Sequence, residues 1–236
     1  MPVRAITFDF WGTLFRDARS EERQRFRLEA VMRAAGVGEE AARNALQETF
    51  REFYRSHLED QRTLRPEDGV RMTFERLGAS LHPDVADELT HLFATAILNY
   101  PPDPIDYALD AVRAAAQRYP VGLISDTGIS PGSSLRVLMD RHQFTEHFVA
   151  LTFSDEVGVA KPQTPMFART AEALDVAPEE LFHIGDLEPT DIVGARNVGA
   201  KAALYAGVND RFLGNTQAHH TFTDWREFIA LLPEIA

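Results

Sequence analysis

The spacing of apolar residues changes once along this chain and separates two kinds of segment. Between residues 17 and 100, apolar side chains recur with a helical period, most regularly over 42–58 and 85–97. Shorter helices are expected around 20–35 and 67–77, because glycines follow both segments and act as stops. The pattern therefore predicts a bundle of about four helices.

Outside this bundle, short apolar strands alternate with helices. The segment PPDP at 101–104 marks the change, since proline lacks a backbone donor and disfavours helix in the residue before it. The predicted strands are 3–8, 121–125, 149–153, 181–185 and 201–206. One helix is predicted before each of the last four strands: 106–118, 132–141, 165–175 and 189–198. Strands separated by single helices indicate an α/β fold with a parallel, doubly wound sheet.

The first predicted strand precedes the helical bundle, whereas the other strands follow it. We therefore expect one α/β core made of residues 1–15 and 101–236, with a helical domain of residues 16–100 inserted after the first strand. The chain has 236 residues, of which 44% are hydrophobic, and this is enough to build such a core.

Polar residues follow three of the predicted strands. Asp9 follows the first, Ser125, Asp126 and Thr127 end the second, and Asp186 follows the strand 181–185. Ligand sites in parallel sheets form at the carboxyl ends of the strands, so these side chains should converge.

Two further charged residues belong to the same predicted edge. Lys161 lies in the loop before a helix, and Asp191 lies five residues after Asp186, at or just inside the next helix. Three carboxylates, a hydroxyl and an ammonium group are thereby expected at one end of the sheet.

Four segments carry a family resemblance: FDFWGTL, LISDTG, AKP and HIGDLEPTDIVGARNVG. Their identity and order resemble the motifs of the haloacid dehalogenase-like hydrolase superfamily, and the resemblance covers the whole chain. It implies a Rossmann-like core, and the inserted helices look like the helical C1-type cap of that superfamily. The phosphatase branch of the superfamily is the best match.

The resemblance also implies roles for individual residues. Asp9 would be the nucleophile that forms an aspartyl-phosphate, which divides one difficult displacement into two easier ones. Ser125 would hydrogen-bond the phosphoryl oxygens. Lys161 would neutralise charge on the nucleophile and on the phosphate of a small phosphorylated substrate.

A Mg²⁺ site is implied in the same way. Asp9, Asp186 and the backbone carbonyl of Trp11 would hold the ion, with Asp191 orienting the ion or its water. Hard oxygen ligands of this kind suit Mg²⁺, which keeps several waters and bridges to phosphate. A divalent cation would also offset the repulsion between an anionic substrate and a chain of net charge −12.

Two positions depart from the family pattern. Phosphatases of the family usually carry a second aspartate, a general acid/base, where this chain has Trp11, and the asparagine after the Ser/Thr is Asp126 here. The metal ligand is unaffected by Trp11, because it is a backbone carbonyl.

The departures leave alternative functions open. Metal-free 2-haloacid dehalogenases also carry an aromatic residue at the Trp11 position, although their last motif typically lacks the acidic pair that Asp186 and Asp191 supply. A catalytically weak phosphometabolite-binding protein is a third hypothesis. A phosphonatase-like mechanism is excluded, because it needs a lysine in the cap and residues 16–100 contain none.

Each candidate residue also has a purely structural interpretation. Asp9 could cap a turn, Asp191 could be the N-cap of a helix, and Lys161 could be a surface lysine. Asp126 fits either a turn or the lining of the site, and Trp11 could fill the interface between core and bundle.

Other polar residues are expected outside the chemistry. His183 lies inside a strand and is expected to be a hydrogen-bonded core histidine, whereas His219 and His220 are expected in a solvated loop. The start of the bundle carries four arginines at helical spacing: Arg16, Arg19, Arg23 and Arg27. We expect a charged face, from which one or two could reach a substrate.

Composition restricts the possible partners. With 36 acidic and 24 basic residues, the chain is unsuited to binding nucleic acid, and without cysteine it has neither disulfides nor a thiolate site. The start MPVRAITFDF lacks the features of a signal peptide, and no apolar stretch approaches membrane-spanning length. We expect a cytoplasmic protein with no membrane partner; the sequence does not distinguish a monomer from a homodimer.

Overall fold

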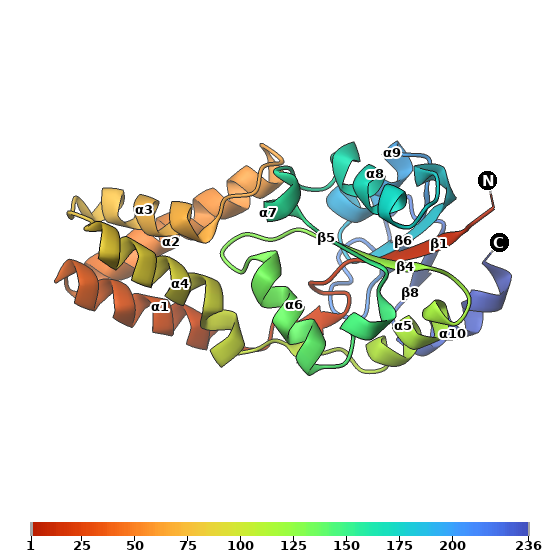
Figure 1. Ribbon diagram of the computed structural model, residues 1–236, viewed down its shortest axis with the longest axis horizontal. Coiled ribbons are helices and arrows are strands. Elements are labelled where there is room, and N and C mark those ends of the chain that lie inside the picture. The colour runs from red at the N-terminus through yellow and green to blue at the C-terminus, as the bar shows by residue number, and fades with distance from the viewer. Residues whose placement is uncertain (1, 236) are drawn as a thin grey trace.

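The computed structural model describes residues 2–235. It shows a parallel sheet with helices on both faces and, at one end, a bundle of four helices (Figure 1). The strands of the sheet are β1 (Ala5–Phe8), β4 (Val121–Ser125), β5 (Ala150–Phe153), β6 (Leu181–Gly185), β7 (Lys201–Tyr205) and β8 (His220–Phe222). The bundle consists of α1 (Ser20–Ala35), α2 (Glu39–Leu58), α3 (Pro66–Leu77) and α4 (Pro83–Asn99). The helices around the sheet are α5 (Ala108–Ala116), α6 (Gly132–Arg141), α7 (Ser154–Val157), α8 (Thr164–Ala173), α9 (Val193–Asn197) and α10 (Trp225–Leu231).

The strand order confirms the predicted doubly wound sheet. The strands lie in the order β5-β4-β1-β6-β7-β8, and every neighbouring pair is parallel. The direction of winding reverses at β1, which lies between β4 and β6. The segments that follow these three strands therefore leave the sheet side by side, at the place where ligands bind in open α/β sheets.

Apolar side chains fill both faces of the sheet. Val112, Leu138 and Phe228 belong to the cluster under α5, α6 and α10, whereas Phe167 and Ala195 belong to the cluster under α8 and α9 (Figure 1). Because both faces are covered, the central strands are continuous apolar runs instead of alternating ones. Such runs between glycines and helices are what made the strands predictable.

The C-terminal part of the sheet differs from the prediction. His220 is the first residue of β8, and Nδ1 of His219 accepts a hydrogen bond from the backbone N–H of Ala202 at 3.1 Å. The interpretation as a solvated loop is therefore wrong for His220, which belongs to a strand, whereas His219 lies in the bend before that strand; both side chains are exposed. A strand of three residues is too short to show an alternating pattern, so β8 could not be predicted from the sequence.

The bundle has the four helices that the helical period predicted. Their apolar faces meet in a cluster that includes Val31, Leu46, Phe74 and Phe93. The two linkers to the core pair with each other as short antiparallel strands, β2 (Phe15–Arg16) and β3 (Asp103–Pro104). Whether residues 16–100 move as a separate domain stays a prediction. None of the helices within residues 2–235 is long and apolar enough to cross a membrane.

Candidate active site

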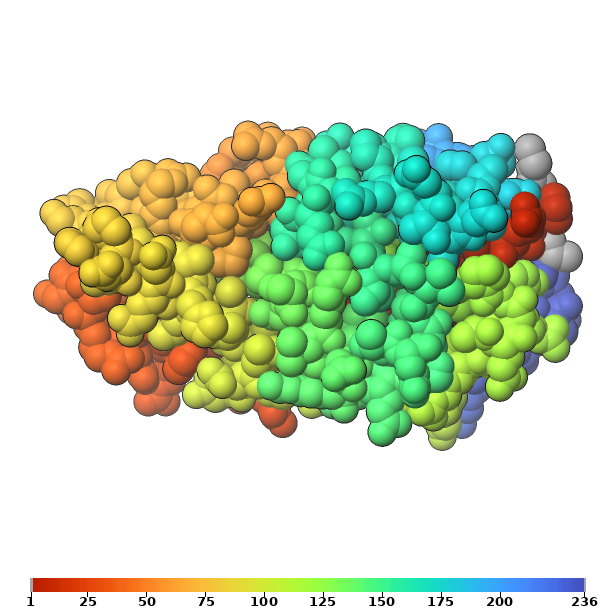
Figure 2. Space-filling view, in the orientation of Figure 1, coloured from red at the N-terminus to blue at the C-terminus, as the bar shows by residue number. Residues whose placement is uncertain are grey.

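A cavity of about 440 Å³ lies between the carboxyl edge of the sheet and the bundle. From the core it is lined by Asp9, Trp11, Asp126, Thr127, Lys161 and Asp186, with Asp191 beside them. From the bundle it is lined by Arg23, Gln24, Arg27, Phe50 and His57. Figure 2 shows the yellow and orange surface of the bundle lying directly against the green surface of the core, so the cavity has walls from both parts of the chain.

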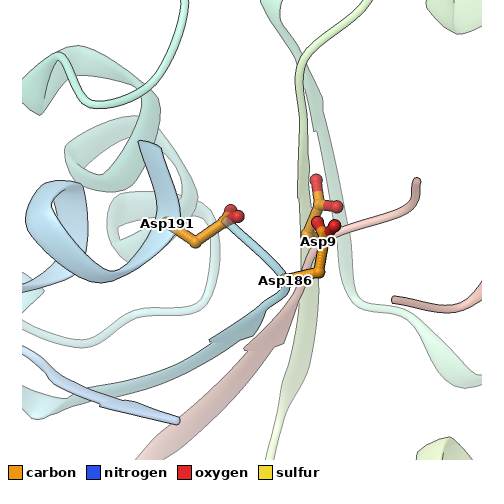
Figure 3. Close-up of side chains that lie close together, drawn as sticks. All are labelled: Asp9, Asp186 and Asp191. Carbon is orange, nitrogen blue, oxygen red and sulfur yellow. The ribbon is translucent and has the colours of Figure 1, made fainter. Parts of the chain in front are cut away.

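Three aspartates meet at the sheet edge, as predicted. Asp9 directly follows β1 and Asp186 directly follows β6, and the two strands are neighbours. Asp191 approaches from the π-helical segment Glu188–Ile192 that precedes α9 (Figure 3). One carboxylate oxygen from each residue lies within 4.8 Å of the others.

Lys161 joins two of these aspartates. Its Nζ donates hydrogen bonds to Oδ1 of Asp9 and to Oδ1 of Asp191, both at 2.6 Å, and to the carbonyl oxygen of Ile124 at 3.0 Å. The side chain is fully buried, and burial alone would lower the pKa of its ammonium group. The facing Asp191 and Asp9 carboxylates more than offset burial and hold the pKa of Lys161 above its usual range. The structure contradicts the surface interpretation of Lys161.

Asp191 is held on every side. Besides Lys161, its Oδ1 lies 3.1 Å from Nε2 of His183, and its Oδ2 accepts the backbone N–H of Leu187 at 3.0 Å. Burial would raise the pKa of Asp191, but Lys161 and His183 outweigh it and hold the pKa well below the usual range. His183 is fully buried, and its Nδ1 lies 2.9 Å from Oγ1 of Thr7. The prediction of a hydrogen-bonded core histidine is therefore confirmed, with Asp191 as one of its partners.

Asp9 and Asp186 are less well compensated. Burial raises the pKa of Asp9 to about 7, and burial together with the nearby Asp9 raises the pKa of Asp186 to about 8. The one hydrogen bond to Asp186 from side chains of residues 2–235 comes from Nδ2 of Asn209, at 3.4 Å. The backbone of Gly12 (φ +67°) passes so close that a Cβ there would lie 2.5 Å from Oδ2 of Asp186. Within the described part of the chain, these two buried carboxylates have only the Lys161 ammonium group nearby to balance their negative charge. Their oxygens therefore form a set of ligands that fits a divalent cation.

The three polar residues at the end of β4 differ in whether they line the cavity. Oδ1 of Asp126 accepts the backbone N–H of Lys161 at 2.9 Å, and Oγ1 of Thr127 donates to Oδ1 of Asp155 at 2.6 Å. Both residues line the cavity. Ser125 is fully buried, donates its hydroxyl to the carbonyl oxygen of Asp126 at 3.2 Å, and is not among the residues that line the cavity. Its predicted role in binding phosphoryl oxygens therefore stays a prediction.

Trp11 lies where the family's second aspartate usually stands. It is partly buried, lines the cavity and packs edge-to-face on Phe10, with ring centroids 5.1 Å apart. Its side chain therefore shapes the cavity, and its indole has no acidic group to offer there.

The bundle wall contains residues that the sequence did not identify. His57, near the end of α2, has Nε2 3.7 Å from Oδ2 of Asp126, across the cavity. The sequence feature that could have identified His57 is its position on the otherwise apolar face of the helix predicted over 42–58. The charged-face interpretation holds for Arg16 and Arg19, which are exposed, whereas Arg23 and Arg27 are buried and line the cavity, the position expected of the one or two arginines that could reach a substrate. Helical spacing fixed their common face and could not show that this face covers a cavity.

The comparison with protein families decides the classification. A sequence model of haloacid dehalogenase-like hydrolases matches residues 3–199. The chain belongs to this family. The match includes the candidate site residues from Asp9 to Asp191 together with all four bundle helices.

Individual relatives add detail. This hydrolase is 27% identical over 203 residues to the glyceraldehyde 3-phosphate phosphatase of Methanopyrus kandleri, covering 84% of this chain and 81% of the relative. It is 32% identical over 120 residues to the phosphoserine phosphatase of Thermus thermophilus, covering 51% of this chain and 47% of the relative. The crystal structure of the 2-haloacid dehalogenase of Pseudomonas syringae pv. Tomato superposes with a TM-score of 0.71 at 18% identity, covering 99% of this chain and 97% of that chain. That likeness shows a shared fold.

Proposed function

We propose that this hydrolase removes the phosphoryl group from small phosphorylated metabolites, in a Mg²⁺-dependent reaction that passes through an aspartyl-phosphate on Asp9. The observation that carries the proposal is the environment of Asp9. Its Oδ1 is held by a buried lysine, whereas its Oδ2 makes no hydrogen bond within residues 2–235. One oxygen is therefore fixed, and the other is available to a substrate in the cavity.

This geometry supports a two-step reaction. Oδ2 of Asp9 attacks phosphorus, so that a bond from Asp9 to phosphorus forms while the bond from phosphorus to the ester oxygen breaks and the alcohol leaves as its oxyanion, which takes a proton from water. The Lys161 ammonium favours the ionised form of Asp9 and orients it. Water then hydrolyses the aspartyl-phosphate, which releases inorganic phosphate and restores the Asp9 carboxylate.

The metal would be held mainly by Asp9, Asp186 and the backbone carbonyl of Trp11. When bound, Mg²⁺ supplies positive charge to the phosphoryl oxygens. Asp191 fits a different task, because Lys161, His183 and the N–H of Leu187 already occupy its oxygens. We assign it the role of positioning Lys161 against Asp9.

Charge favours a phosphatase over a metal-free dehalogenase. Four aspartates (Asp9, Asp126, Asp186 and Asp191) and one lysine line the core side of the cavity. The carboxylate of a 2-haloacid is bonded to the carbon that Asp9 would attack, so it would lie at this wall, which would repel it without a bound cation. The two relatives named as phosphatases support the same conclusion.

The test is a comparison of two substrates. Purified protein is incubated with p-nitrophenyl phosphate and Mg²⁺, and separately with 2-chloropropionate, while released phosphate and chloride are measured. We expect phosphate release that depends on Mg²⁺ and no chloride release. Chloride release without a metal would favour the dehalogenase, and binding of phosphorylated compounds without any product would favour a binding protein.

A further inference from the structure

Arg27 lies in an unusual environment, in the part of the cavity wall that the bundle forms. The residue is 3% exposed and lines the cavity from α1. Its Nη2 donates to the carbonyl oxygen of Phe93 at 3.0 Å, but its buried Nε has no hydrogen-bond partner. Within residues 2–235, no carboxylate forms an ion pair with this guanidinium. A buried cation without a counter-charge is rare in folded proteins.

Arg23, one helical turn earlier, is the opposite case. Its Nη1 donates to the carbonyl oxygen of Tyr100 at 2.7 Å, and its Nη2 pairs with the carboxylate of Asp17. The charge of Arg23 is therefore compensated within the protein. Among the residues described, Arg27 is the arginine in this wall that lacks an ion pair, although the Asp17 carboxylate that pairs with Arg23 also partly offsets the lowering of the Arg27 pKa by burial.

The surroundings hold the Arg27 guanidinium in place as a cation. It lies 5.8 Å from the ring centroid of Phe50 and 5.9 Å from that of Phe93, within the range of cation–π attraction. Burial, followed by the nearby charge of Arg23, lowers the pKa of Arg27 to about 9, so the group remains charged at neutral pH. Burying an unpaired charge destabilises the folded protein, and a bound anion would remove that cost.

We propose that Arg27 binds a carboxylate of the substrate, so that the preferred substrates are small phosphate monoesters that carry a carboxylate at the end remote from the phosphoryl group. This inference rests on the proposed function, because it places the phosphoryl group at Asp9 in the other wall of the same cavity. The guanidinium presents a planar fork of donors that matches a carboxylate.

Charge balance selects a carboxylate over a second phosphate. Arg23, Arg27 and Asp17 together carry one net positive charge, which matches a singly charged anion. The Phe50 and Phe93 rings beside Arg27 would solvate a second negative charge poorly.

The test compares two probes that differ only at the remote end. 3-Phosphoglycerate carries a carboxylate where glycerol 3-phosphate carries a hydroxymethyl group, and kcat/KM is measured for both with Mg²⁺. We expect the wild-type enzyme to favour 3-phosphoglycerate by about 10- to 100-fold, the size of a charge-assisted hydrogen-bonded pair. In Arg27→Met this ratio should fall close to one, because effects on the chemical step common to both probes cancel.

Matched variants complete the design. Arg25→Met removes an exposed arginine of the same helix that pairs with Glu29, and the ratio should stay at the wild-type value. Arg27→Lys keeps the charge without the planar fork, and it should give an intermediate ratio. If Arg27→Met does not fold, as judged by circular dichroism, Arg27→Lys alone decides, since an unchanged ratio would overturn the proposal.

The outcomes separate this inference from the proposed function. Hydrolysis of both probes with a ratio near one in the wild type, or a ratio that Arg27→Met leaves unmoved, would overturn the carboxylate site alone. If no phosphate ester is hydrolysed, the proposed function fails, and calorimetric binding of the two probes to wild type and Arg27→Met still decides on Arg27. Tighter binding of 1,3-propanediol bisphosphate than of 3-phosphoglycerate would overturn the assignment to a carboxylate.

Discussion

The two walls of the cavity are built in contrasting ways. In the sheet edge, contacts link segments far apart in the sequence, as Lys161 does with Asp9 across 152 positions, and the lysine is compensated by two aspartates. In the bundle wall, Arg27 donates one hydrogen bond to the carbonyl oxygen of Phe93, but within residues 2–235 its Nε has no hydrogen-bond partner and no carboxylate pairs with it. The sheet edge thus holds its lysine in position before a ligand arrives, whereas the bundle wall leaves a charge for a ligand to satisfy. The contrast suggests that the sheet edge performs the chemistry and that the bundle selects the substrate.

The strongest test of this contrast is a substitution of Asp9, the proposed nucleophile at the sheet edge. Asp9→Asn keeps the shape of the side chain but replaces the attacking carboxylate by an amide, a poor nucleophile. We expect turnover of p-nitrophenyl phosphate to fall by about 10⁴-fold or more, in the range found when a nucleophile is removed. Circular dichroism and the thermal midpoint serve as controls for folding. Normal turnover in a folded variant would reduce Asp9 to a structural role.

Removal of divalent cations should have the next largest effect. Asp9 and Asp186 would face an anionic phosphate without compensation, so we expect excess chelator to lower activity by roughly 10³-fold, a loss of several kcal/mol of charge stabilisation. Added Mg²⁺ should restore the activity. Full activity in chelator would mean that Lys161 is the sole cation needed, and the metal assignment would be wrong.

The same contrast explains how far the sequence could predict the site. Asp9, Asp126 and Asp186 were predictable, because each follows an apolar strand and parallel topology brings strand ends together. The ion pair of Lys161 with Asp191 was not, since it depends on how a loop and a π-helical turn approach each other. In the bundle, helical period gives the face of Arg23 and Arg27 but not what that face covers. Asp191 is an intermediate case: its place at the sheet edge was predicted from the sequence, whereas its hydrogen-bond partners could be identified only in the structure.

Trp11 offers a test at the boundary of the two walls. A positioned acid contributes roughly 10²- to 10⁴-fold by protonating the leaving oxygen, and an indole cannot do this. We therefore expect a preference for acidic leaving groups, with alkyl phosphates cleaved slowly. Trp11→Asp should raise the ratio of kcat/KM for an alkyl phosphate to that for an aryl phosphate, by about 10-fold or more.

Two results would limit this interpretation. Loss of a fully buried tryptophan costs about 3–5 kcal/mol, an upper limit for the partly buried Trp11, so a denaturant melt must show that Trp11→Asp is folded. A wild-type enzyme that cleaves alkyl and aryl phosphates equally, with a ratio that the substitution does not change, would show that another residue supplies the proton. His57 would then be the first to substitute, because it lies 3.7 Å from Asp126 across the cavity.

The smallest expected effect concerns motion of one wall against the other. Within residues 2–235, two hydrogen bonds join the bundle to α6: Ser134 Oγ donates to the carbonyl oxygen of Ala94 at 2.8 Å, and Arg141 Nη1 donates to that of Leu98 at 3.0 Å. Its two linkers are paired as β2 and β3, so a movement of the bundle must bend both together. If the bundle closes over a bound phosphate to exclude water, the linkers should be more ordered in the closed state.

Hydrogen exchange can measure this ordering. Exchange of the backbone amides of residues 15–17, Tyr100 and Asp103 should slow by a few-fold when vanadate binds with Mg²⁺, because the pairing of β2 with β3 opens less often in a closed enzyme. Amides of β1 are the internal control, since that strand is buried in the centre of the sheet and should be protected in both states. Ser134→Ala should weaken the docking of the bundle on α6 and speed exchange in the linkers of the free enzyme. Unchanged linker exchange despite confirmed vanadate binding would mean that the bundle is fixed, and selectivity would then rest on Arg27 and the shape of the cavity without a closing motion.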